Sequence, residues 1–104
     1  MSAVTITQIL DDLRVADEII RGFERRYWLS SADFYALYQQ GLLDDGEHTD
    51  DFAEWSAYYQ VRLDRETTLQ QLSQDRLRRL KARRRGKMLS IDPHEPAIRP
   101  PSTA

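Results

Sequence analysis

Chemistry in this chain of 104 residues would have to come from carboxylates, arginines and aromatic side chains. The chain contains no cysteine, which excludes disulfides, thiolate metal sites and cysteine nucleophiles. The two histidines, His48 and His94, fall in a predicted loop and a predicted tail, where neither is held rigidly for catalysis. A glycine-rich phosphate loop and the HExxH and GxSxG motifs are also missing from the sequence. We therefore expect a protein that is not an enzyme and that binds no cofactor.

Acidic residues gather in the first half of the chain. Residues 1–54 carry 12 acidic and 4 basic residues, a net charge of −8. Six carboxylates lie between residues 44 and 54 with no lysine or arginine among them: Asp44, Asp45, Glu47, Asp50, Asp51 and Glu54. Such a segment either contacts a charged partner or complements the dipole at the start of a helix. Its spacing does not fit a calcium-binding loop, so we expect no metal site.

Basic residues gather in the second half. Residues 55–104 carry 11 basic and 5 acidic residues, a net charge of +6, and eight of the bases lie between residues 76 and 87. Arginines bind the phosphates of nucleic acids or an acidic protein surface, but no helix-turn-helix or strand-based reader of bases is visible. The candidates for either contact are Arg76, Arg79, Arg83, Arg84 and Arg85.

The elements that position these charges are helices. Apolar residues spaced alternately by three and four predict a first helix over about residues 5–28, with Thr5 and Gln8 forming a capping box. A second, short helix is predicted over about 31–40, with Ser30 as its N-cap and Gly41 at its end.

The third predicted helix, about 50–85, is longer than the first. At 1.5 Å per residue it spans about 54 Å against about 36 Å for the first helix, so an antiparallel partner covers only part of it. Its last turns still carry four leucines: Leu69, Leu72, Leu77 and Leu80. A second copy of the chain or another protein would cover them, or this end would stay frayed. We assign the four leucines to self-association, in a coiled-coil homodimer.

The sequence thus predicts an all-α fold with two long antiparallel helices and a short bridging helix. Residues 1–85 form the helical domain with a protruding basic end, and residues 86–104, which hold all four prolines, form a disordered tail. No apolar run is long enough to cross a membrane, and we expect a cytoplasmic protein.

Aromatic side chains are dense between residues 27 and 59. Most belong to the core, but two or three must lie outside a small interior, and tryptophan and tyrosine often anchor interfaces. Tyr35 lies off the face that carries Phe34 and Tyr38, and Tyr58 points about 100° away from Tyr59. We therefore assign Tyr35 and Tyr58 to an interface.

The stretch from Leu29 to Tyr59 resembles small helical proteins of bacteria and archaea. In those proteins an aromatic turn precedes Ser-x-x-x-Phe-Tyr, a Gly-Leu step, an acidic loop and a helix with a tryptophan. The matching residues are Ser30, Phe34, Tyr35, Gly41, Leu42, Asp44, Asp45 and Trp55. The resemblance implies an antitoxin, encoded beside a ribonuclease-like toxin that it binds.

The expected function is therefore partner binding, and most specifically the neutralisation of a cognate toxin. We expect the aromatic start of the third helix and the acidic loop to make that contact, through Tyr35, Asp44, Asp45, Asp51, Trp55 and Tyr58. An acidic segment would occupy the cationic site of a toxin that acts on RNA. One alternative is a small nucleic-acid-binding factor that acts through residues 76–87, and a second is an adaptor subunit of a larger assembly.

Overall fold

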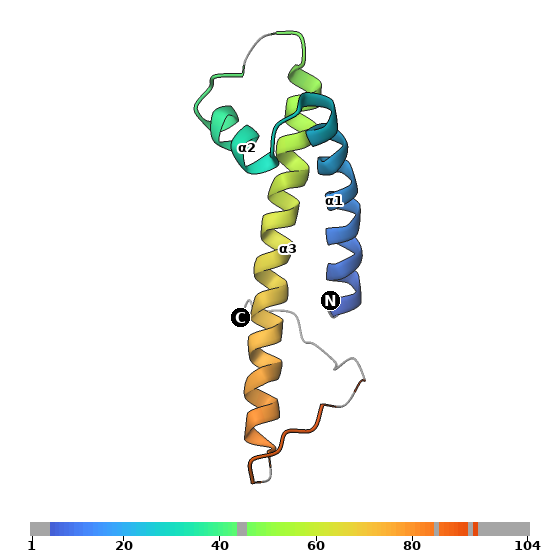
Figure 1. The fold of residues 1–104 in the computed structure, drawn as a ribbon, viewed down its shortest axis with the longest axis vertical. Coiled ribbons are helices and arrows are strands. Elements are labelled where there is room, and N and C mark those ends of the chain that lie inside the picture. Colours follow the sequence, from blue (N-terminus) through green and yellow to red (C-terminus); the bar gives the residue numbers. More distant parts are fainter. Residues whose placement is uncertain (1–4, 44–45, 85, 92, 94–104) are drawn as a thin grey trace, which may run out of the picture.

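The computed structural model describes residues 5–43, 46–84, 86–91 and 93. Over these residues the chain forms α1 (Ile6–Tyr27), α2 (Ser31–Gln39) and α3 (Thr49–Ala82), as Figure 1 shows. The predicted all-helical composition, with two long helices and one short helix, is confirmed. The third helix ends at residue 82, three residues earlier than predicted. The predicted tail is described only at 86–91 and 93, where no helix forms.

Local signals at the start of α1 act as predicted. The hydroxyl of Thr5 accepts the backbone N–H of Gln8 at 3.1 Å, and the Gln8 side chain accepts the backbone N–H of Thr5 at 3.4 Å. These two bonds satisfy N–H groups that have no partner inside the helix. The apolar stripe that predicted this helix provides its buried face: Ile9, Ala16, Ile20 and Phe23.

The short helix α2 is also bounded by its predicted caps. Ser30 accepts a backbone N–H of the first turn, and Gly41 takes the left-handed conformation with φ 72°. Gly41 and Leu42 then donate their N–H groups to the carbonyls of Tyr38 and Leu37, both at 3.1 Å. This pair of bonds is a Schellman motif, which ends the helix and turns the chain towards α3.

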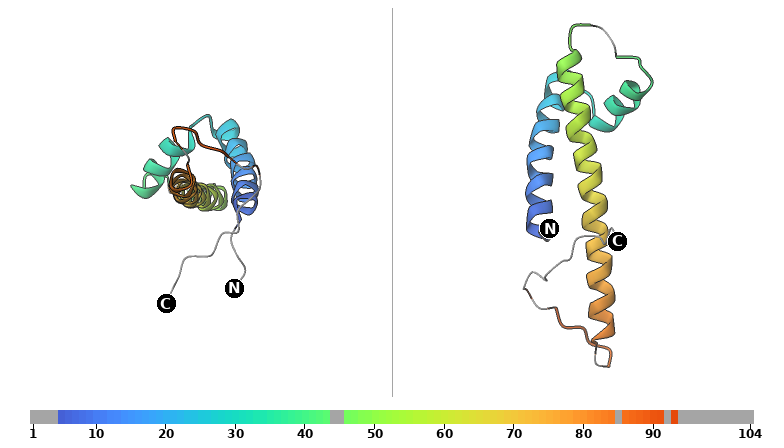
Figure 2. Two further views of the ribbon diagram at one scale, coloured as in Figure 1. Left: turned by 90° about the horizontal axis from the view of Figure 1, so that it is seen from below. Right: turned by 180° about the vertical axis from the view of Figure 1, so that it is seen from behind.

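Two ion pairs show how α1 and α3, which lie side by side, are aligned (Figures 1 and 2). Arg26 pairs with Asp51 at 2.9 Å near one end, and Asp12 pairs with Arg65 at 2.9 Å towards the other. Residue numbers therefore fall along α1 as they rise along α3, and the first residue of α1 lies level with about residue 71. The part of α3 from residue 73 to 82, about 15 Å long, projects beyond α1.

Trp55 is the centre of the core, and each of the other helices packs against its ring. Phe34 of α2 stacks on it with ring centroids 3.8 Å apart and planes 3° apart. Phe23 and Tyr27 of α1 stack at 5.6 and 5.7 Å. Aromatic rings bury large apolar areas, so this stack is a main source of stability for the three-helix arrangement.

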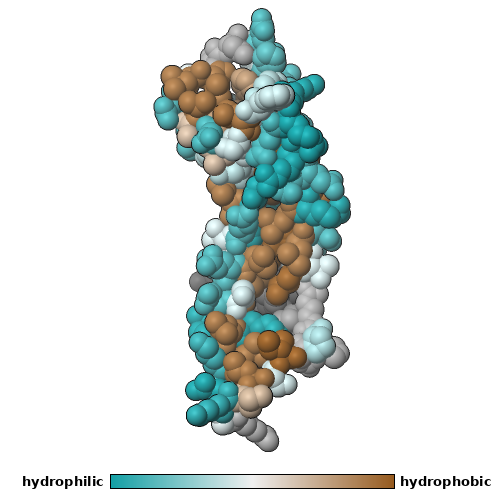
Figure 3. Space-filling model, viewed as in Figure 1, coloured by the Kyte–Doolittle hydropathy of each residue, from teal (hydrophilic) through white to brown (hydrophobic). Residues whose placement is uncertain are grey.

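Apolar surface remains outside this core. In Figure 3 it gathers over the α2 end of the molecule and again lower down, where α1, α3 and residues 86–91 lie. Among the described residues, no helix is both long and apolar enough to cross a membrane.

Candidate functional site

The turn between α1 and α2 presents the most exposed large apolar side chain of the described residues. Trp28 ends α1 with φ 56° and ψ 45°, and its side chain is 91% exposed. The left-handed region costs a residue with a Cβ atom about 1–2 kcal/mol. Because the indole buries almost no area, the folded chain alone gains little from a tryptophan at this position.

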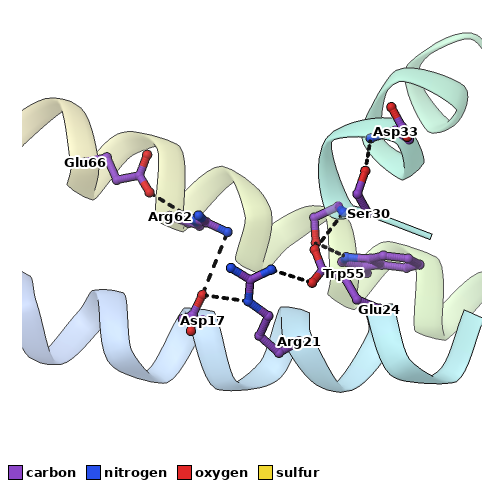
Figure 4. Close-up of polar contacts among 9 residues, drawn as sticks. Asp17, Arg21, Glu24, Ser30, Asp33, Trp55, Arg62 and Glu66 are labelled. Atoms are coloured by element: carbon purple, nitrogen blue, oxygen red, sulfur yellow. Dashed lines mark hydrogen bonds and ion pairs between the residues drawn. The ribbon is translucent and has the colours of Figure 1, made fainter. Parts of the chain in front are cut away.

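A buried hydrogen-bond chain holds this turn in place. The Trp55 indole N–H donates to the Ser31 hydroxyl at 2.8 Å, and that hydroxyl donates to the Glu24 carboxylate at 2.7 Å. The backbone N–H of Ser31 donates to the same carboxylate oxygen at 2.8 Å. These hydrogen bonds therefore connect α3, the start of α2 and the last turn of α1 (Figure 4).

Burial alone would raise the pKa of Glu24. The hydrogen bonds from Ser31 and Arg21 outweigh it, so the pKa of Glu24 lies below the ordinary glutamate value. The carboxylate thus stays charged at neutral pH, and its negative charge stands at the N-terminus of α2, where the helix dipole favours it.

From Glu24, further hydrogen bonds and ion pairs continue across the surface between α1 and α3 (Figure 4). Arg21 donates to Glu24 at 2.7 Å and lies 3.4 Å from Asp17. Asp17 in turn lies 3.8 Å from Arg62, which pairs with Glu66 at 2.9 Å. Of these four pairs, Asp17–Arg62 joins α1 to α3, whereas the other three lie within one helix.

One residue that was predicted to contact a partner is buried in the core. Trp55 was assigned to partner contact, but it is 0% exposed and stacked between rings of α1 and α2. The apolar stripe of α3 is continuous from core to surface, so its sequence pattern does not reveal which turn the other helices enclose.

Other residues predicted to contact a partner make contacts within the folded chain. The Asp51 carboxylate accepts the Tyr27 hydroxyl at 2.6 Å and Arg26 at 2.9 Å, which fastens α1 to the start of α3. Tyr58 and Tyr35 are half-buried and pack against the core cluster. Asp44 and Asp45 lie outside the described residues. Of the acidic segment, Asp50, Glu54 and Glu47 are exposed.

The predicted basic segment begins on α3 and continues past its end. Arg78 and Arg79 share the Asp75 carboxylate at 3.2 and 2.9 Å. Arg76 is half-buried, whereas Arg83 and Arg84 are exposed beyond the last helical residue. Arg85 lies outside the described residues. Positive charge is therefore concentrated at the tip of the projecting helix.

The four leucines assigned to self-association all lie on α3. Leu69 and Leu72 are half-buried and level with the first turns of α1. Leu80 is half-buried and Leu77 is 38% exposed, and both lie beyond the start of α1. The described residues contain no group of three histidines or carboxylates that could hold a metal ion.

Sequence reasoning missed Trp28, Glu24 and Ser31. The signal for Trp28 is its position, one residue after Tyr27, which packs against the core, and so about 100° away from the buried face of α1. No local pattern marks Glu24 and Ser31, because their partners come from different helices.

Comparison of the chain with known protein families, with curated proteins and with solved structures finds no match. The resemblance expected over residues 29–59 therefore stays a prediction.

Proposed function

We propose that this chain is a non-enzymatic protein-binding module and that Trp28 anchors its partner. The observation that carries this proposal is the combination of 91% exposure with a left-handed backbone at a tryptophan. A partner that covers the indole gains the burial that the fold leaves unused, and tryptophan is the residue type most enriched among interface anchors. The hydrogen-bond chain through Ser31 keeps the turn rigid, so little order is lost on binding.

More specifically, we propose that the partner is a toxin and that the chain is its antitoxin. The resemblance over residues 29–59 supports this assignment. The exposed carboxylates Asp50 and Glu54 at the start of α3 supply negative charge of the kind that would occupy the cationic site of a ribonuclease. Trp28 would then provide affinity, while the carboxylates would provide the electrostatic match.

The test is a pull-down from the native cell with the full chain as bait, in wild-type form and as the Trp28→Gly variant. We expect the wild-type chain to retain one small protein in equal amount, and the variant to lose most of it. The retained protein, once freed, should cleave RNA and stop doing so when the wild-type chain is added back. A partner without nuclease activity would end the antitoxin proposal, and equal retention by both baits would end the role of Trp28.

The matched control for Trp28→Gly is Leu10→Gln. Leu10 is also an exposed apolar residue of α1, at 49% exposure, but it lies five turns from the α1–α2 turn. Loss of the partner with Leu10→Gln as well would indicate a general effect on α1 rather than a contact at Trp28.

A further inference from the structure

Four basic side chains at and beyond the end of α3 are exposed: Lys81, Arg83, Arg84 and Lys87. We call these four residues the basic tip. Within the described part of the chain, none of them pairs with a carboxylate. The sequence has no acidic residue between 76 and 91, and a helix C-terminus carries only about half a negative charge. Most of the positive charge of the basic tip is therefore not balanced within the fold.

The basic tip surrounds the helix end instead of following one face. Arg83, the C-cap of α3, comes two residues after Lys81, so the two side chains leave the helix about 200° apart, on nearly opposite sides. A duplex nucleic acid carries a row of phosphates on each side of its grooves, so cations on opposite sides of one helix end can each reach a row. A flat bilayer, or one acidic face of a protein, would meet only one side.

The basic tip is also far from the acidic half of the molecule. At 1.5 Å per residue, about 48 Å of helix separates Asp50 from the last residue of α3. Charges further apart than about 8 Å are largely screened in physiological salt. In Figure 1 the end of α3 lies at the opposite end of the molecule from α2. The net charge of −2 of the whole chain therefore does not repel a polyanion from the basic tip.

The surroundings of the basic tip favour a duplex over a single strand. From residue 60 to residue 104 the sequence contains no Phe, Tyr or Trp. Proteins that bind single strands stack nucleobases on such rings, whereas a duplex keeps its bases paired and presents phosphates at higher density. We propose that the basic tip binds duplex nucleic acid through its phosphates, without sequence preference. This surface is separate from Trp28, so the inference goes beyond the proposed function.

The experiment measures the affinity of the full chain for a short, fluorescently labelled DNA duplex by anisotropy at several salt concentrations. The slope of log affinity against log salt is about −0.9 for each phosphate neutralised. With four basic residues in contact we expect a slope of about −3.6, which weakens binding about 150-fold between about 50 and 200 mM salt. A DNA duplex of scrambled sequence should bind equally well. An RNA duplex of the first sequence shows which kind of duplex supplies the better phosphates, and tight binding of either supports the inference.

Variants test whether the basic tip makes the contact. Arg84→Gln should weaken binding at low salt and reduce the slope by about 0.9, and replacing all four residues with Gln should abolish binding. The matched control is Arg14→Gln on α1, where the arginine side chain is also exposed, at 64%. This control and Trp28→Gly should leave affinity and slope unchanged. All altered positions are exposed, and unchanged far-ultraviolet circular dichroism checks that the three helices persist.

A bilayer as the ligand would give a different result. Met88 and Ile91, close to the basic tip in the chain, are 77% and 70% exposed and would suit the interior of a membrane surface. Tighter binding to vesicles of phosphatidylcholine and phosphatidylserine than to DNA, lost in the Met88→Ser, Ile91→Ser chain, would overturn the inference.

Four further results would also overturn it. They are no binding to either duplex at low salt, a slope that Arg84→Gln leaves unchanged, tighter binding to single-stranded DNA than to the duplex, and displacement of the duplex by an equal charge of polyglutamate. The last result would identify an acidic protein surface as the ligand.

Discussion

Replacing Ser31 with alanine tests whether the buried hydrogen-bond chain holds the three helices together. In the folded protein the Ser31 hydroxyl accepts the Trp55 indole N–H and donates to Glu24, at 2.8 and 2.7 Å. Alanine removes both bonds without adding volume. The Trp55 side chain is fully buried, so its N–H would be left without a partner.

The size of the effect follows from these two losses. A buried donor left unpaired costs about 1–3 kcal/mol, and a hydrogen bond to a charged acceptor contributes about 1.5–3 kcal/mol. Glu24 keeps the Ser31 backbone N–H and Arg21, which offsets part of the second loss. We expect Ser31→Ala to lower the free energy of unfolding by about 2–4 kcal/mol.

The assay is urea unfolding followed by far-ultraviolet circular dichroism and by tryptophan fluorescence. A Trp28→Phe background leaves Trp55 as the sole tryptophan, so its emission reports on the core. Two serine-to-alanine controls have different expected costs. Ser30→Ala removes the α2 N-cap and should cost about 1 kcal/mol. Ser73→Ala, at an exposed position inside α3, should cost nothing.

A loss for Ser31→Ala no larger than that for Ser30→Ala would refute the reasoning, because the buried chain would then add nothing to a simple cap. An additive double mutant of Ser31→Ala with Glu24→Gln would refute it too, since the shared hydrogen bond requires coupling of at least about 0.5 kcal/mol.

Three further predictions concern the surface. Trp28→Gly should raise the free energy of unfolding by about 0.5–1 kcal/mol in chemical denaturation, because glycine adopts the left-handed conformation freely; a loss of stability would show that the indole supports the fold. The pKa of Glu24 is lowered in the folded protein, so its contribution to stability is present above the ordinary glutamate pKa and is lost as pH falls through the folded pKa. Glu24→Gln should flatten this part of the curve of unfolding free energy against pH. An unchanged curve would show that the hydrogen-bonded Glu24 carboxylate does not stabilise the fold. A double-mutant cycle of Asp12→Asn with Arg65→Gln should give a coupling below about 1 kcal/mol that shrinks with salt, and a salt-independent value would contradict an exposed pair.

Local signals were sufficient to predict the helices of this fold. The capping box at Thr5, the cap at Ser30 and the left-handed Gly41 are all interactions between residues close in the chain, so their spacing carries the information. The alternating apolar spacing likewise predicted which face of α1 is buried. The end of α3 was placed three residues too late, because no glycine or proline marks it before Gly86.

The candidate site was predicted less well, because it depends on which residues meet from different helices. Trp55 was assigned to a surface although Phe34 and Phe23 enclose it. Trp28 was not among the residues assigned to an interface, although it is 91% exposed at the end of α1. Ser31 gave no signal, because both of its side-chain partners come from other helices. Periodicity identifies a face, but tertiary packing decides how far along the helix that face is covered.

The most direct test of the central claim is the affinity of the purified partner for the wild-type chain, Trp28→Gly and Leu10→Gln. The account predicts that Trp28→Gly weakens binding by about 30-fold, the effect of an anchor worth about 2 kcal/mol, while its fold is at least as stable as the wild type. Leu10→Gln should bind normally. Wild-type affinity in the Trp28→Gly chain would show that the exposed tryptophan is not the contact, and the claim would be wrong.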